Sequence, residues 1–174
     1  MTLAAFFSNF LRFVLLLLAQ VFVLNQIAWG WGGRAYLFVF GYPLFVALLP
    51  LRTPRPLVIG LSFLLGLSID FFSETLGLHA GALTATAYAR PLILRSLRPR
   101  DGYNIKARPS IADLGTGWMA QYLTLLLLVH LLVFFLLQTF SILFAGEIAI
   151  KTALSLPASL LTTGIFVLLF SSKT

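Results

Sequence analysis

Long apolar runs, broken at intervals by Gly, Pro and charged residues, dominate the pattern along this chain. The breaks separate six apolar segments, at residues 3–29, 35–49, 57–72, 80–97, 116–144 and 151–170. A transmembrane helix needs about 20 mainly apolar residues, so each segment predicts one membrane-spanning helix. The second segment is short and the fifth is longer than the hydrocarbon core requires, which predicts local thinning and tilt, respectively. The pattern therefore predicts an all-α membrane protein, one transmembrane domain over residues 1–174 that forms a six-helix bundle.

The composition agrees with lipid as the solvent of this chain. Hydrophobic residues make up 60% of the chain and charged residues 10%, with a mean hydropathy of +1.00. A soluble domain is nearer half apolar and a quarter charged. Six spans leave no room for a separate soluble domain. The chain has no Cys, which excludes disulfides, thiolate metal sites and Cys nucleophiles.

The basic residues predict the orientation in the membrane. With the N-terminus inside, eight of the twelve Lys and Arg residues fall in inside segments and two, Arg34 and Lys151, fall outside. Cytoplasmic loops carry an excess of Lys and Arg, so both termini are predicted to be cytoplasmic. This explains the net charge of +7 without a nucleic-acid partner. The basic loop at residues 98–115 is predicted to contact anionic lipid headgroups rather than an acidic cytoplasmic protein.

Ionisable residues inside the predicted spans are costly and therefore informative. They are Arg12, Asp70, Arg90 and His130. We expect Asp70 to form an ion pair with Arg12 or Arg90 that holds helices together. We expect His130 to be neutral and hydrogen-bonded within the bundle rather than part of a proton relay, because no acidic residue lies near it in the sequence.

Small residues predict close helix packing. Gly77 and Gly81 lie on one face of a helix, and Ala82, Ala85 and Ala89 line a second strip of the fourth span. Small residues let helix backbones approach closely in lipid. We expect the fourth span to pack closely against Gly60 and Gly66 of the third span. In the first span, a face turned toward the bundle is predicted from residues spaced by four, namely Ser8, Arg12, Leu16 and Gln20.

The sequence predicts no catalytic, cofactor or metal site. It contains no nucleophile elbow, phosphate-binding loop, dinucleotide fingerprint or zinc-protease motif. A zinc site at His79 would need carboxylates such as Asp70 or Glu74, and we do not expect one. The candidate structural or interaction residues are Arg12, Asp70, Gly77, His79, Gly81 and Arg90.

A short motif at the end of the third span resembles the MreD family of rod shape-determining membrane proteins. It reads Gly66-Leu67-Ser68-Ile69-Asp70-Phe71-Phe72-Ser73, followed by Gly77-Leu78-His79-Ala80. In that family, a span ending in Gly-Leu-x-x-Asp leads through a short outer turn into Gly-Leu-(His or Asn)-Ala, which opens the next span. Length, span number and the basic loop match across the whole chain, while the motif itself covers about fifteen residues.

The resemblance implies a non-enzymatic, multi-pass component of the bacterial cytoplasmic (inner) membrane. MreD-like proteins regulate cell shape within the complex that synthesises lateral peptidoglycan. They bind MreC and work near MreB filaments, the glycosyltransferase RodA and its transpeptidase. The family fold resembles the substrate-binding subunit of energy-coupling-factor transporters, which implies a polar outer cavity near Asp70 and His79.

Two other functions remain open at the level of sequence. The first is a solute-binding subunit of a vitamin-type transporter, with a pocket supplied by Trp29, Trp31, Tyr36, Asp70, Glu74 and His79. The second is a membrane enzyme acting on a lipid-linked substrate. That enzyme would need catalytic groups clustered at one membrane face, and the sequence shows none.

Overall fold

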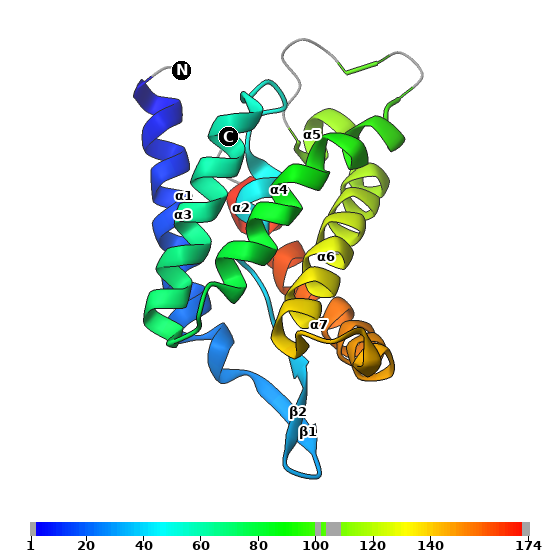
Figure 1. Ribbon diagram of the computed structural model, residues 1–174. Helices are drawn as coiled ribbons and strands as arrows, with labels where there is room; N and C mark the ends of the chain where they lie inside the picture. Colours follow the sequence, from blue (N-terminus) through cyan, green and yellow to red (C-terminus); the bar gives the residue numbers. More distant parts are fainter. Residues whose placement is uncertain (1–2, 100–101, 104–108, 172–174) are drawn as a thin grey trace.

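The computed structural model describes residues 3–99, 102–103 and 109–171 and is mostly helical (Figure 1). Its elements are α1 (Leu3–Phe22), η1 (Leu24–Gln26), β1 (Ala28–Trp31), β2 (Arg34–Phe38), α2 (Leu44–Leu48), α3 (Arg55–Ser73), α4 (Leu78–Ser96), α5 (Ile111–Leu114), α6 (Thr116–Thr139), η2 (Ile142–Phe144) and α7 (Ala145–Ser171). In the predicted basic loop, Arg100, Lys106 and Arg108 lie outside the described residues. So does Lys173.

Four helices in the described part of the chain are long and apolar enough to cross a membrane. They occupy Phe7–Gln26, Arg55–Ser73, Thr116–Thr139 and Ala145–Leu169. The fold is thus compatible with an all-α membrane protein. The helix α4 has similar length but is less apolar, because it carries His79, Arg90 and Arg95.

The predicted second span, residues 35–49, is not a transmembrane helix. It contains β2, an extended stretch that continues from the end of β2 at Phe38 to residue 41, a turn at residues 42–43 and the five-residue helix α2. The cause lies in Gly41 and Pro43, which interrupt the apolar run and favour a turn over a continuous helix. The first predicted span also ends early, at Phe22, because residues 28–31 pair with β2 as an antiparallel hairpin.

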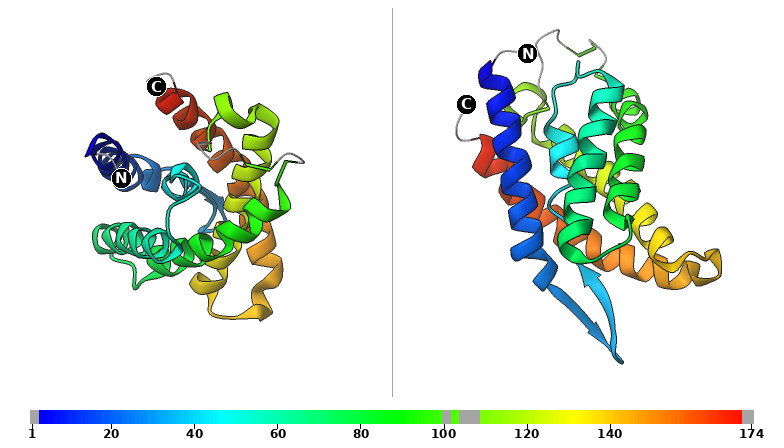
Figure 2. Two further views of the ribbon diagram at one scale, coloured as in Figure 1. Left: turned by 90° about the horizontal axis from the view of Figure 1, so that it is seen from above. Right: turned by 60° about the vertical axis from the view of Figure 1, so that its left-hand side comes forward.

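The segment from β2 to α2 nevertheless runs through the bundle. Figure 2 shows α2 among the long helices, and its right-hand view shows the β1–β2 hairpin projecting past their ends. The start of α1 and the end of α7 lie at the same end of the bundle as the α2–α3 loop and the end of α4 (Figure 1).

Side chains of two helices satisfy the backbone of the extended stretch. Gln20 of α1 donates from Nε2 to the Val39 carbonyl at 3.0 Å and accepts from the Gly41 amide at 2.9 Å. On the other side, the Phe38 and Phe40 amides donate to Ser155 and Ser159 of α7, both at 3.0 Å. Non-helical backbone at membrane depth is tolerated only where protein supplies its hydrogen bonds. The extended stretch can therefore remain non-helical, because side chains of α1 and α7 supply its backbone hydrogen bonds.

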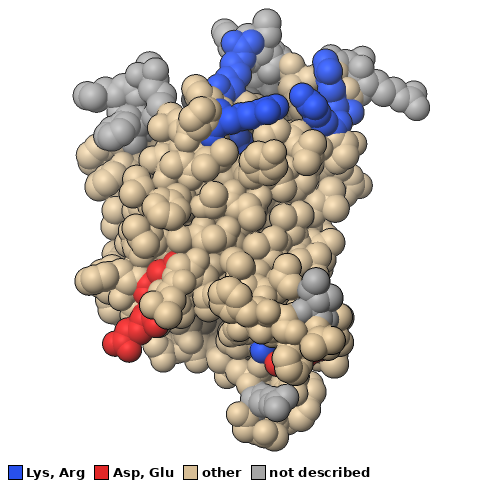
Figure 3. Space-filling model, in the orientation of Figure 1, with Lys and Arg blue, Asp and Glu red and all other residues tan. Residues whose placement is uncertain are grey.

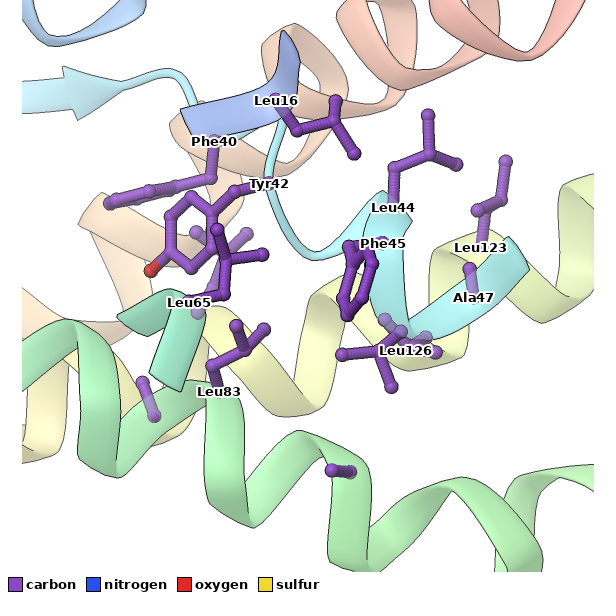
Figure 4. Packing of buried hydrophobic residues seen from close by; sticks show 14 of the residues in the cluster. Leu16, Phe40, Tyr42, Leu44, Phe45, Ala47, Leu65, Leu83, Leu123 and Leu126 are labelled. Carbon is purple, nitrogen blue, oxygen red and sulfur yellow. The ribbon is translucent and has the colours of Figure 1, made fainter. Parts of the chain in front are cut away.

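The hydrophobic core forms around this segment (Figure 4). Tyr42, Leu44, Val46 and Ala47 are completely buried. They pack against the long helices, with Leu16, Leu65, Leu83 and Leu126 among their neighbours in Figure 4. The short segment is thus the centre of the bundle rather than a peripheral span.

Candidate functional site

The helices α3 and α4 touch backbone to backbone at Gly66. A Cβ built on Gly66 would lie 2.5 Å from the Ala80 Cα and 2.7 Å from the His79 carbonyl oxygen. The expected close approach is therefore right for Gly66, although it is made by His79 and Ala80, which lie outside the predicted alanine strip. It is wrong for Gly60, where a Cβ would meet nothing within 4 Å.

Asp70 caps the start of α4 from the neighbouring helix. Its Oδ1 accepts from the His79 amide at 3.0 Å, and its Oδ2 accepts from the Ala80 amide at 2.8 Å. The N-cap residue of α4 is Gly77, at φ 79°, and it has no side chain to satisfy these donors. A carboxylate at a helix N-terminus both accepts the free amides and complements the helix dipole.

The imidazole of His79 completes this cap. Its Nδ1 lies 3.0 Å from the Asp70 Oδ1, and the Thr75 hydroxyl donates to the same oxygen at 2.5 Å. Asp70 and His79 are only 3% and 4% exposed. The rings of Phe40, Tyr42 and Phe134 pack around His79. Aromatic side chains therefore surround the buried imidazole of His79.

A second set of buried hydrogen bonds, centred on the completely buried His130 of α6, connects α6 with α4 and with the turn before α2. The Thr86 hydroxyl donates to the Ala82 carbonyl at 2.7 Å, so we assign it as acceptor from His130 Nδ1 at 3.0 Å. Nε2 then accepts from the Tyr42 hydroxyl at 2.7 Å. A neutral imidazole satisfies this arrangement, since one ring nitrogen donates and the other accepts. The expected hydrogen bonding of His130 within the bundle is confirmed.

The expected pairing of Asp70 with Arg90 is wrong. Arg90 donates from Nε to the Tyr122 hydroxyl at 2.9 Å and from Nη2 to the Leu49 carbonyl. It is 3% exposed and fixes the end of α2 to α4 and α6. The prediction was wrong because a continuous helix at residues 35–49 would have used its own carbonyl groups. The short helix α2 instead leaves the Leu49 carbonyl free to accept from Arg90. A pairing with Arg12, which is half-buried on α1, remains a prediction.

The two glycines Gly77 and Gly81 have different roles, and the predicted inward face of α1 is only partly right. Gly77 is a turn residue, with open space where its Cβ would be, whereas a Cβ on Gly81 would lie 2.9 Å from Leu137 of α6. They therefore do not form a common face against α3. The predicted inward face of α1 is right for Leu16 and Gln20 and wrong for Ser8, which is exposed.

Sequence reasoning missed the residues that hold the extended stretch. Ser155 and Ser159 were not singled out, although with Thr163 they recur every fourth residue along α7. All three are completely buried. That spacing places them on one helix face. Together with the Gly41-Tyr42-Pro43 interruption, it was an available signal for a non-helical segment beside α7.

Apolar surface lies on the outside of the bundle. Phe7, Phe10, Leu11, Leu15 and Leu18 of α1 are exposed. An apolar groove of about 290 Å³ separates α1 from α3. Its lining residues are Asn9, Phe10, Phe13, Phe45, Leu49, Thr53, Leu57, Leu61 and Leu64. This surface suits lipid or a transmembrane helix of another protein.

The ionisable groups of the core are engaged in holding elements together. Asp70, His79, His130 and Arg90 all make hydrogen bonds between elements. Among the described residues, no group of three or more His, Asp or Glu side chains is placed to hold a metal ion. The arrangement can support a rigid bundle with an apolar exterior.

Comparisons with known proteins identify no relative. No protein-family model, no curated protein and no solved structure matches this chain. The resemblance to MreD therefore rests on the residues of the chain itself.

Proposed function

We propose that this chain is a non-enzymatic membrane scaffold of the bacterial cell-elongation machinery, which binds MreC and regulates cell shape during lateral peptidoglycan synthesis. The observation that carries the proposal is that the residues of the MreD-like motif contact one another at the junction of α3 and α4. Gly66 admits the backbone of Ala80, Gly77 makes the turn, and Asp70 caps α4 with the help of His79. Residues that resemble a family motif thus depend on one another in one helix junction.

The outer surface supports a binding role. A protein with short loops acts mainly through its helix faces, and α1 offers an exposed apolar face beside the groove on α3. We propose that the single transmembrane helix of MreC packs against this face. RodA, its transpeptidase and MreB are further proposed neighbours.

The proposed location is the bacterial cytoplasmic membrane, with both ends of the chain inside. Support comes from the charge distribution in Figure 3, where Lys and Arg gather at one end of the molecule. The start of α1 and the end of α7 lie at that same end (Figure 1). The positive-inside rule assigns the basic end to the cytoplasm.

Purification from the native membrane tests this function. We expect the tagged chain, extracted in a mild detergent, to bring down MreC, recognised as a protein with one N-terminal span, a coiled coil and a periplasmic domain. Groove-filling variants such as Leu61→Trp should reduce the yield of MreC, whereas Leu76→Trp, at a fully exposed position remote from the groove, should not. Recovery of an ATPase pair with a coupling subunit would overturn the scaffold and favour the transporter subunit.

A further inference from the structure

A cavity rich in arginine opens at the basic end of the molecule. Its volume is about 510 Å³, and it lies between the α2–α3 loop, the start of α3 and the second half of α4. Five arginines line it: Arg52, Arg55, Arg90, Arg95 and Arg98. Figure 3 shows the gathering of basic side chains at this end.

The positive charge of the cavity is not balanced by the described part of the protein. No described Asp or Glu lines the cavity. The guanidinium groups of Arg52, Arg55, Arg95 and Arg98 make no ion pair with a described carboxylate. Like charges brought together repel, and a bound anion relieves that repulsion.

Arg90 gives the cavity a fixed and buried component. Its Nε and Nη2 are held by the Tyr122 hydroxyl and by the Leu49 and Pro50 carbonyls. Its Nη1 is the guanidinium nitrogen without a hydrogen bond to any described residue. A guanidinium that is already oriented loses little entropy when it binds an anion, and its planar donors match phosphate oxygens.

We propose that this cavity binds a phosphate-bearing anion, with Arg90 at its base and Arg55 and Arg95 at its rim. The volume lies in the range typical of small-molecule sites and exceeds the need of a bare phosphate. The ligand is therefore a phosphate ester such as a glycerol phosphate headgroup. It comes either from an anionic phospholipid or from a soluble phosphorylated molecule. The proposal holds whether or not the chain is a scaffold.

Binding to the purified full chain in a neutral detergent tests the site, with native mass spectrometry as the readout. The lipid probe is phosphatidylglycerol against diacylglycerol, and the soluble probe is glycerol phosphate against glycerol. We expect one phosphate probe to bind in preference to its phosphate-free control. Preference for phosphatidylglycerol alone identifies a lipid, and comparable binding of glycerol phosphate identifies a soluble ligand.

Matched variants localise the binding. Arg55→Gln and Arg95→Gln alter exposed side chains and should each weaken binding about tenfold, as expected for loss of one charged hydrogen-bonding group. Arg55→Lys should lose less. Arg34→Gln removes one charge from the hairpin and should change nothing. Equal binding of both probes and their controls, or equal weakening by Arg34→Gln and Arg55→Gln, would overturn the proposal.

Discussion

Gly66 of α3 faces Ala80 of α4 so closely that a Cβ on Gly66 would lie 2.5 Å from the Ala80 Cα and 2.6 Å from its nitrogen. Real Cβ atoms do not approach a backbone this closely, so any side chain at Gly66 must separate the two helices. The separation would also move the Ala80 amide away from Asp70 Oδ2, which now lies 2.8 Å from it. Helix packing and helix capping are therefore coupled at this junction.

Gly66→Ala should destabilise the protein by about 1–3 kcal/mol, the usual cost of overpacking a tight contact. The measurement is the melting temperature of the purified protein in detergent. Gly60→Ala is the matched control on the same helix, because a Cβ there meets nothing within 4 Å. Equal melting temperatures for the two variants would show that the α3–α4 contact does not limit stability.

Asp70→Ala should cost roughly 3–5 kcal/mol, because it leaves the His79 and Ala80 amides and the Thr75 hydroxyl without their acceptor. The readout is again thermal unfolding in detergent. Glu74→Gln serves as control, since Glu74 is exposed at the end of the same helix. A wild-type melting temperature for Asp70→Ala would argue that the cap contributes nothing.

Ser155→Ala and Ser159→Ala should each destabilise by about 1–3 kcal/mol, since each leaves a backbone amide of the extended stretch without its acceptor. Ser68→Ala is a suitable control because the Ser68 hydroxyl donates only to the Leu64 carbonyl of its own helix. Hydrogen exchange should show faster exchange at the Phe38 and Phe40 amides in the respective variants. Unchanged exchange at both amides would contradict the assigned acceptors.

Single cysteines test the orientation, because the chain has none of its own. A membrane-impermeant thiol reagent added to intact cells should label Gly32→Cys in the β1–β2 turn and should not label Thr53→Cys in the α2–α3 loop. Labelling of both positions should occur after the membrane is permeabilised. The opposite pattern in intact cells would reverse the proposed orientation.

Sequence periodicity located helices well where the chain is regular. Segments 57–72, 80–97 and 116–144 correspond to α3, α4 and α6 within a few residues at most boundaries. It failed at residues 35–49, since apolar content alone does not distinguish a helix from a buried extended stretch. The outcome there depends on Gln20, Ser155 and Ser159, which lie far away in sequence.

The candidate site could be predicted only where its residues lie close together in the sequence. Gly66, Asp70, Gly77 and His79 lie close in sequence, so their association could be expected from the motif. The acceptors of Arg90 could not be expected, because the Leu49 and Tyr122 positions follow from tertiary packing. The arginine cavity was likewise hidden, since its lining comes from segments more than 30 residues apart, such as Arg55 and Arg95.

Depletion of the protein in the cells that make it tests the scaffold proposal most directly, with the ratio of cell length to cell width as the measurement. The proposal predicts that rod-shaped cells widen and become round as the protein is lost. Re-expression of the wild type or of Gly60→Ala should restore the rods. Cells that keep their length-to-width ratio while losing uptake of a vitamin-like solute would contradict the scaffold and identify a transporter subunit.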